Sequence, residues 1–215
     1  GGTGSLVSTS CGTSGTATSG PSNAGAGINV PINSNTDWSG PNNITTVGAS
    51  YATVTLLPGY NSDYLQATGY GFNIPAGATI NGIQVYINRS GEQSWLFGLG
   101  FRDDRVHLVK NSVIQTGTNR ASGSTWPTTL TTTPYGSTGD LWGNTWTPAD
   151  INNANFGVAI SVHSDLILST LTATIDYLQI IVTYTLPPSL EWYTASSGGS
   201  PIATGSPFDP TPFLP

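Results

Sequence analysis

Residues 70–89 read Tyr-Gly-Phe-Asn-Ile-Pro-Ala-Gly-Ala-Thr-Ile-Asn-Gly-Ile-Gln-Val-Tyr-Ile-Asn-Arg. In the second half, Ile83, Val85 and Ile87 alternate with Gln, Tyr and Asn, which is the two-residue period of a half-buried β-strand. The Pro-Ala-Gly at 75–77 breaks the chain before it, because proline cannot donate to a β-ladder and glycine tolerates turn geometry. The stretch therefore predicts two strands joined by a turn.

The partner expected for this pair is the strongest strand signal in the chain, residues 173–185. Its apolar residues fall on both faces, with Leu178, Ile180 and Val182 on one and Tyr177 and Ile181 on the other. A strand that is apolar on both faces is usually covered on both sides, so we expect this one to be central. The predicted core residues are Ile83, Val85, Leu178, Ile180 and Val182.

Shorter strand patterns occur elsewhere in the chain. Asn111-Ser112 is typical of a hairpin turn between two of them. Ahead of this turn, Val106 and Leu108 are expected to point inward and His107 outward. Residues 94–101 are apolar but irregular. The strand patterns cover residues 51–57, 105–110, 113–115 and 156–162.

No long amphipathic helix pattern occurs, and only one short helix is expected. Thr147 can cap its N-terminus, Pro148 suits the first helical position, and Asp150 stands where a capping box has its acid. The sequence therefore predicts an all-β fold. We expect an antiparallel β-sandwich of jelly-roll or immunoglobulin-like type, with at most one short helix near residues 148–153.

Composition divides the chain into three segments. Residues 1–27 are rich in Gly, Ser and Thr and have little to bury, as in a linker or a partial strand. Residues 28–186 carry the strand patterns and form the expected sandwich domain. Residues 187–215 are rich in proline and contain a short strand-turn-strand pattern around Trp192, which is too small for a core of its own.

The charge of the chain excludes several classes of partner. Charged residues make up 7% of the 215 residues, and the formal charge is −6. Lys110 is the only lysine and no basic run occurs, so we expect neither nucleic acid nor an anionic membrane surface as a partner. No apolar run is long enough to span a bilayer, so no membrane insertion is expected. The expected partners are other protein modules or subunits of the same surface structure, with glycans as a further class.

Sulfur is scarce, because Cys11 is the only cysteine and methionine is absent. A single cysteine cannot form an intrachain disulfide, and no neighbouring histidine lowers the pKa of its thiol. We therefore do not expect Cys11 to be catalytic. Few oxidisable residues, together with abundant Thr, Asn and Gly, favour an exported protein located outside the cell or at its surface.

Two stretches resemble known families. Residues 190–210, with Glu-Trp-Tyr-Thr, Ser-Ser-Gly-Gly-Ser-Pro-Ile and Ala-Thr-Gly-Ser-Pro-Phe, resemble the start of an immunoglobulin-like repeat of large surface proteins of Bacteroidota-type bacteria. Residues 38–185 resemble a β-sandwich domain of bacterial surface proteins that also occurs in phage proteins. The matching residues are 71–75, 78–83, 109–110, 135–136, 141–143, 155–157 and Asp176. The resemblances imply an extracellular module that is not an enzyme, and no catalytic residue carries over.

Candidate metal and catalytic residues are few. Asp103 and Asp104 could supply oxygen ligands for Ca²⁺, but the arginines on either side favour surface charges that pair among themselves. His107 and His163 are too far apart in the sequence to indicate a zinc site. No Gly-x-Ser-x-Gly elbow occurs, and only two glutamates are present. We expect no catalytic site and no cofactor, with Asp103 and Asp104 as the only metal candidates.

Four aromatic residues, Trp126, Tyr135, Trp142 and Trp146, crowd into a stretch rich in Gly, Thr and Asn. Two interpretations are open: exposed rings that bind the apolar face of a sugar, or rings that pin a long loop onto the sandwich. The resemblance favours the second. The predicted function is a non-enzymatic structural or adhesive module of a secreted or cell-surface bacterial protein. The alternatives are a carbohydrate-binding module of a larger secreted protein, with these four rings as its ligand-binding residues, and a phage virion surface or tail protein.

Overall fold

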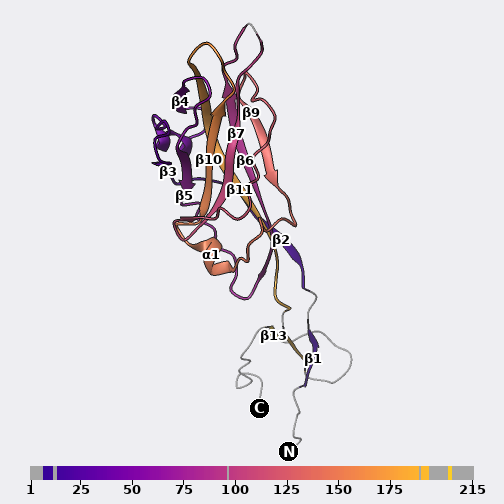
Figure 1. Ribbon diagram of the computed structural model, residues 1–215. Coiled ribbons are helices and arrows are strands. Elements are labelled where there is room, and N and C mark those ends of the chain that lie inside the picture. Colours follow the sequence, from indigo (N-terminus) through magenta and orange to yellow (C-terminus); the bar gives the residue numbers. More distant parts are fainter. Residues whose placement is uncertain (1–6, 12–13, 96, 189, 194–202, 205–215) are drawn as a thin grey trace, which may run out of the picture.

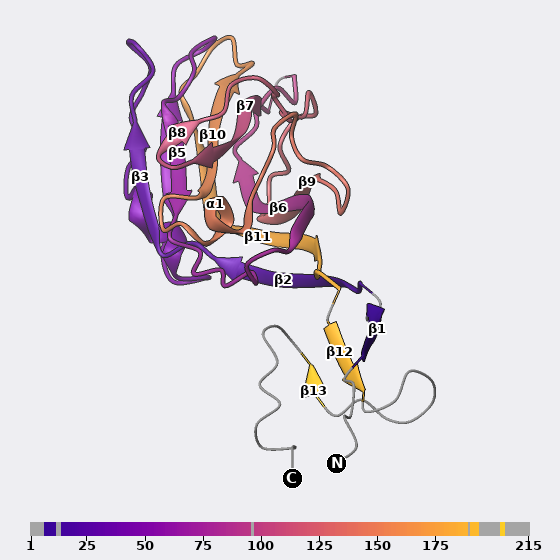
Figure 2. The same cartoon turned by 90° about the horizontal axis from the view of Figure 1, so that it is seen from below.

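The computed structural model describes residues 7–11, 14–95, 97–188, 190–193 and 203–204. Two antiparallel sheets pack against each other, as the sequence predicts (Figures 1 and 2). The strands of the sandwich are β2 (Thr16–Asn23), β3 (Ala26–Val30), β4 (Ala52–Leu56), β5 (Tyr64–Thr68), β6 (Thr79–Gly91), β7 (Phe101–Lys110), β8 (Val113–Ile114), β9 (Thr131–Gly136), β10 (Gly157–Ser164) and β11 (Leu171–Thr185). The helical turns are η1 (Pro41–Thr45) and α1 (Pro148–Asn152).

The order of the strands identifies the sandwich as a jelly roll. One sheet runs β2-β11-β6-β9, with β4 also paired to β11, and the other runs β3-β5-β10-β7-β8. The pairs are nested: β7–β8, β6–β9, β5–β10 and β2–β11 all pair antiparallel, and successive pairs lie in alternate sheets. The chain is therefore one long antiparallel ribbon, doubled back on itself and rolled into two layers, which is the jelly-roll arrangement.

The ribbon doubles back at Asn111-Ser112, where the sequence predicts a hairpin turn. Asn111 has φ 50° and Ser112 has φ 67°. Two successive residues with positive φ form the tight turn whose twist matches that of the flanking strands. The hairpin prediction is confirmed by the pairing of Val109 with Ile114 and of Lys110 with Val113.

The predicted core is confirmed, but one expectation about β11 is wrong. Ile83, Val85, Leu178, Ile180 and Val182 have no exposed surface. β11 is central, with β6 on one edge and β2 and β4 on the other. Its second face is not fully covered, because Tyr177 and Ile181 are only half-buried. β11 therefore contributes one side to the core and leaves the other partly open to solvent.

The strand expected at residues 70–74 does not form. Gly69 and Gly71 have φ 75° and 67°, a left-handed conformation that interrupts an extended strand. The segment still buries Tyr70, Phe72 and Ile74 at the end of the sandwich. The side chain of Asn152 in α1 replaces a neighbouring strand, because its Oδ1 accepts from the backbone N of Ile74 at 2.7 Å and its Nδ2 donates to the carbonyl at 2.8 Å.

The short helix forms where the sequence predicts it. Thr147 Oγ1 accepts a hydrogen bond of 3.2 Å from the backbone N of Asp150, and the Asp150 carboxylate accepts one of 2.9 Å from the backbone N of Thr147. Pro148 occupies the start of the helix, and the backbone is extended again at Asn153. This complete capping box explains why five residues suffice for a helix here.

Both terminal segments of the chain contain strands. Residues 16–23, inside the segment expected to be linker or partial strand, form β2 and pair with β11 along its last seven residues. β1 (Val7–Cys11), β12 (Leu190–Tyr193) and β13 (Ala203–Thr204) form a separate three-stranded sheet, seen at the lower end of Figure 1. The N-terminal segment is therefore the pairing partner of the C-terminal one. The side chains of β1, β12 and β13 lie outside the described residues.

Candidate functional site

The four aromatic residues proposed to bind a sugar are all buried. Trp126 is 0% exposed, Tyr135 4%, Trp142 1% and Trp146 7%. A sugar platform needs a ring face open to solvent, and none of these rings offers one. The physical cause is that the loops carrying Trp126, Trp142 and Trp146 fold back over the sandwich, while Tyr135 lies in β9 with its ring in the core.

Hydrogen bonds show how the rings hold this loop. Trp142 Nε1 donates to the carbonyl of Ile83 in β6 at 2.9 Å, and Trp146 Nε1 donates to the carbonyl of Leu141 at 3.0 Å. The Trp146 ring also packs edge-on against Phe156, with 5.4 Å between ring centroids. These contacts support the second interpretation, in which the rings pin the long loop.

Asp103 is enclosed by hydrogen-bond donors between the two sheets. Its Oδ1 pairs with Arg89 of β6 and accepts from Trp126 Nε1 at 2.8 Å. Its Oδ2 accepts from Tyr135 Oη at 3.0 Å and from the backbone N of Ser122 at 2.7 Å. Burial raises the pKa of the Tyr135 phenol, which therefore stays a donor. The two oxygens of the Asp103 carboxylate are therefore bonded to four donors of the protein itself.

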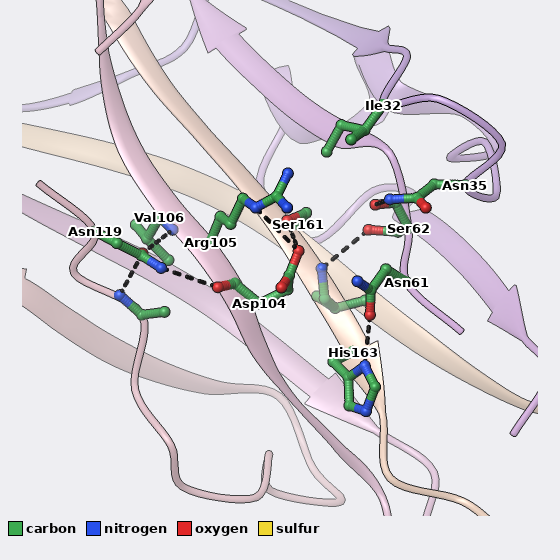
Figure 3. A network of polar contacts seen from close by, with 12 residues as sticks. Ile32, Asn35, Asn61, Ser62, Asp104, Arg105, Val106, Asn119, Ser161 and His163 are labelled. Carbon is green, nitrogen blue, oxygen red and sulfur yellow. Dashed lines mark hydrogen bonds and ion pairs between the residues drawn. The ribbon is translucent and has the colours of Figure 1, made fainter. Parts of the chain in front are cut away.

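Asp104 points to the opposite face of β7. Its Oδ2 accepts from Ser161 Oγ at 2.9 Å and lies 3.5 Å from Arg105 Nε (Figure 3). Because successive residues of a strand face opposite sides, Asp103 and Asp104 cannot share one cation. Within the described part of the chain, no group of three or more His, Cys, Asp or Glu residues could hold a metal ion. The two metal candidates are thus separated by the sheet.

His107 takes the outward position of β7 that the sequence predicts, but its side chain is buried. The loop after β8 covers it, and His107 Nδ1 lies 3.0 Å from the carbonyl of Thr118. Burial lowers the pKa of the imidazole. His163 is half-buried and its Nδ1 is hydrogen-bonded to Asn61 Oδ1. The two histidines contact different partners and do not form a common site.

The exposed large apolar side chains are concentrated at one end of the sandwich. Seven of the twelve large apolar side chains that are exposed within the described residues lie on the loops at one end of the sandwich. We call this region the distal tip, because both terminal segments leave the sandwich at the other end (Figure 1). The residues of the distal tip are Leu57, Tyr60, Trp95, Phe97, Leu130, Ile167 and Leu168.

Backbone hydrogen bonds tie the loops of the distal tip together. The loop between β10 and β11 is joined to the loop between β6 and β7 by Asp165 N to Gly100 O at 3.0 Å. Gly91 N, at the end of β6, donates to Pro127 O at 2.8 Å, and this bond holds the loop before β9 to the end of β6. The loop between β4 and β5 is held to the end of β10, where Ser164 N donates to Tyr60 O at 3.0 Å. The tip is therefore a connected set of loops.

A polar pocket of about 440 Å³ adjoins the distal tip at Tyr60. Its lining includes Asn33, Asn35 and Asn61. Asn35 Nδ2 donates to the carbonyl of Ser62 at 3.0 Å. Figure 3 shows Asn35 and Asn61 on either side of Ser62.

Two features of the sequence mark the distal tip, and neither belongs to a strand pattern. Residues 94–101 are apolar without strand periodicity, and Ile167-Leu168 is an apolar pair between strand patterns. Apolar residues in loops can pack onto the sandwich, as Tyr70 and Phe72 do, but Trp95, Phe97, Ile167 and Leu168 remain exposed. The asparagines that line the pocket could not be recognised in the sequence, because Asn is common throughout the chain.

No helix in the described part of the chain has the length and apolar character needed to cross a membrane. Comparison of the chain with protein-family models, with curated proteins and with solved structures found no match.

Proposed function

We propose that this protein is a non-enzymatic adhesive module of a secreted or cell-surface bacterial protein, tethered at the end where both terminal segments leave the sandwich. It makes contact through the distal tip, and its partner is the apolar surface of another module or subunit of the same structure. The observation that carries the proposal is the gathering of exposed apolar side chains at the tip. Exposed apolar side chains that gather in one region of a folded protein are typical of interaction sites.

Two side chains dominate the tip. Trp95 is 92% exposed and Leu168 is 74% exposed. An aromatic residue that becomes buried in an interface removes a large apolar area from water, and such residues are the usual energetic centres of protein interfaces. Loops held on a rigid sandwich are also a common place for binding residues.

The charges near the tip are already paired within the chain. Arg102 Nε lies 2.9 Å from the Asp165 carboxylate, and the Glu92 carboxylate accepts from the backbone N of Thr172 at 2.7 Å. The tip therefore has little charge to offer a partner. A neutral apolar surface fits it better than a strongly charged one.

The location outside the cell rests on composition. The scarcity of charged residues, the single cysteine and the absence of methionine support an exported protein. The resemblance of residues 38–185 to surface β-sandwich domains supports the same location. The phage-virion alternative stays a prediction, and purification of the native particle that carries the protein would test it.

Adhesion measurements test the role of the tip. The chain is fixed to beads through a C-terminal tag, and its adhesion to methyl-terminated and to hydroxyl-terminated monolayers is compared. Burying one large apolar side chain contributes about 1.5–3 kcal/mol, and each 1.4 kcal/mol is a factor of about ten. The variant Trp95→Ser/Phe97→Ser/Leu168→Ser should therefore lose at least about tenfold in adhesion to the methyl surface.

The matched control is Ile28→Ser/Val113→Ser, which removes exposed apolar side chains away from the tip. This control should adhere like the parent chain, and thermal unfolding should show that both variants stay folded. Equal adhesion of the tip variant and the parent would remove the basis of the proposal, and so would an equal loss in the control.

A further inference from the structure

We infer that the pocket beside the distal tip, lined by Asn33, Asn35, Tyr60 and Asn61, binds a neutral carbohydrate. The inference goes beyond the proposed protein contact, because it names a second ligand class for a neighbouring site of different chemistry. The four buried rings cannot reach a sugar, whereas the Tyr60 ring and the amides of Asn35 and Asn61 can.

The pocket is open, polar and uncharged. Its volume of about 440 Å³ falls in the range of small-molecule sites, roughly 300–1,000 Å³. Asn33, Ser34, Asn35, Gly59, Tyr60 and Asn61 line it, and none of these side chains is charged. A phosphate, a carboxylate or an ammonium ligand would find no opposite charge in this lining, whereas a neutral ligand rich in hydroxyl groups needs none.

The two amides that flank Ser62 present complementary groups. Asn35 Nδ2 is used by the Ser62 carbonyl, and Asn61 Oδ1 is used by His163 Nδ1. Among the described residues, Asn35 Oδ1 and Asn61 Nδ2 have no hydrogen-bond partner, so one acceptor and one donor remain for a ligand. Neighbouring hydroxyls of a sugar can each donate and accept, and they match such a pair.

Hydrogen bonds to Ser62 and His163 fix the orientation of the Asn35 and Asn61 amides (Figure 3). His163 contacts Asn61 through one ring nitrogen, and its other nitrogen, Nε2, lies 3.4 Å from the Asp165 carboxylate. Ser62 is buried, and its Oγ accepts from the backbone N of Val162 in β10 at 3.0 Å. Binding groups that are fixed before the ligand arrives lose less conformational freedom on binding.

Tyr60 supplies the apolar part of the site. Its side chain is 53% exposed, while its backbone is fixed to β10 through Ser164 N and to the turn through Leu57 O at 3.2 Å. An exposed ring of this kind can stack on the C–H face of a pyranose, and the flanking amides can reach its hydroxyls. The combination of one open ring with oriented amides is the chemistry that a sugar recognises.

A second hollow, on the outer face of the β3-β5-β10-β7-β8 sheet, provides the internal control. Its volume is about 530 Å³, and its walls carry Ile28, Val30, Val113 and Ile114. Gln66, Thr68, Ser112 and Asn155 complete the lining, which contains no aromatic ring. Val113→Ser changes it without touching the Tyr60 pocket.

The experiment is a titration with named sugars. Neutral oligomers of glucose, xylose, mannose and N-acetylglucosamine are added to the full ¹⁵N-labelled chain, with a sialylated and a sulfated oligosaccharide as charged probes. We expect at least one neutral oligomer to shift the side-chain amide signals of Asn35 and Asn61. Tyr60→Ala should weaken that oligomer's affinity about tenfold or more, and Tyr60→Phe should retain it, because the ring is kept.

Three outcomes would overturn the inference: no response to any neutral oligomer, unchanged affinity in Tyr60→Ala, or loss of affinity in Val113→Ser. The tip variant Trp95→Ser/Phe97→Ser/Leu168→Ser separates this site from the proposed adhesive contact. It should keep sugar affinity while it loses adhesion. If sugar affinity is lost along with adhesion, the sugar lies on Trp95, Phe97 or Leu168 and not in the Tyr60 pocket.

Discussion

The Asp103 carboxylate accepts a hydrogen bond of 2.8 Å from the indole N–H of Trp126, inside the sandwich. The same carboxylate pairs with Arg89, whose guanidinium carbon lies 4.6 Å from the centre of the Trp126 ring. The pair links β6, β7 and the loop before β9. A charged group that looks like a surface feature in the sequence is thus part of the core.

Removing one partner of this buried pair should be costly. In Asp103→Ala, the Arg89 charge is left buried without its partner, and such a loss typically destabilises by about 3–5 kcal/mol. Urea unfolding measures the change. Asp104→Ala is the control: its partner Arg105 is 40% exposed, so the variant should lose mainly the hydrogen bond from Ser161, about 1 kcal/mol. Similar losses in the two variants would contradict the core role of Asp103.

Trp142 tests the packing interpretation of the aromatic residues. Its side chain is 1% exposed and its indole is bound to the Ile83 carbonyl, so Trp142→Ala should cost about 3–5 kcal/mol. The loss in thermal stability should be the same with and without added oligosaccharide. A variant that stays as stable as the parent but no longer retains glycans would return Trp142 to a binding role.

His107 should make stability depend on pH. Burial lowers the pKa of the folded imidazole below the ordinary value of about 6.5, so the unfolded chain binds more protons in this range. The stabilisation from this group is complete above the unfolded pKa and is lost as pH falls toward the folded pKa. The free energy of unfolding should therefore decrease from pH 7.5 to pH 5, and His107→Gln should flatten that slope.

His163→Gln is the matched control for this experiment, because it removes the other histidine without touching the contact to Thr118. The slopes of the three chains are compared, not their absolute stabilities. An unchanged slope in His107→Gln would mean that the buried imidazole does not control this part of the pH profile.

Limited proteolysis tests the pairing of the two terminal segments. β12 pairs with β1, with Cys11 opposite Leu190. A small three-stranded sheet that loses one of its strands is only marginally stable in water. Deletion of residues 1–13 should therefore accelerate cleavage by proteinase K after Leu186 and leave a stable sandwich. Equal resistance of the C-terminal segment with and without residues 1–13 would exclude β1 as its stabilising partner.

Much of the local structure could be predicted because it is encoded by neighbouring residues. The alternation through Ile83 and Val85 marks a strand with one buried face, and the spacing of Thr147, Pro148 and Asp150 marks a capped helix start. Both depend on contacts within a few residues, and both are confirmed. The strand expected at residues 70–74 failed, because Gly69 and Gly71 take left-handed angles that its alternation does not reveal.

Other features escaped prediction because their causes lie far away in the sequence. β2 has no apolar alternation, and only its pairing with β11 makes it a strand of the sandwich. His107 stands at an outward position of β7 and is nevertheless buried, because the loop carrying Thr118 covers that face. In each case the deciding contact is made by a segment that local periodicity does not report.

The sequence by itself determined an all-β sandwich, its central core residues, its hairpin turn and its single capped helix, since these follow from local alternation and turn chemistry. Only the tertiary structure decided between jelly-roll and immunoglobulin-like order, buried the four aromatic rings, and brought Trp95 and Leu168 together at one end. The physical reason is that a periodic pattern records which face of a strand is buried. Which segments cover that face, and which loops meet at its end, is set by pairing between residues distant in the chain.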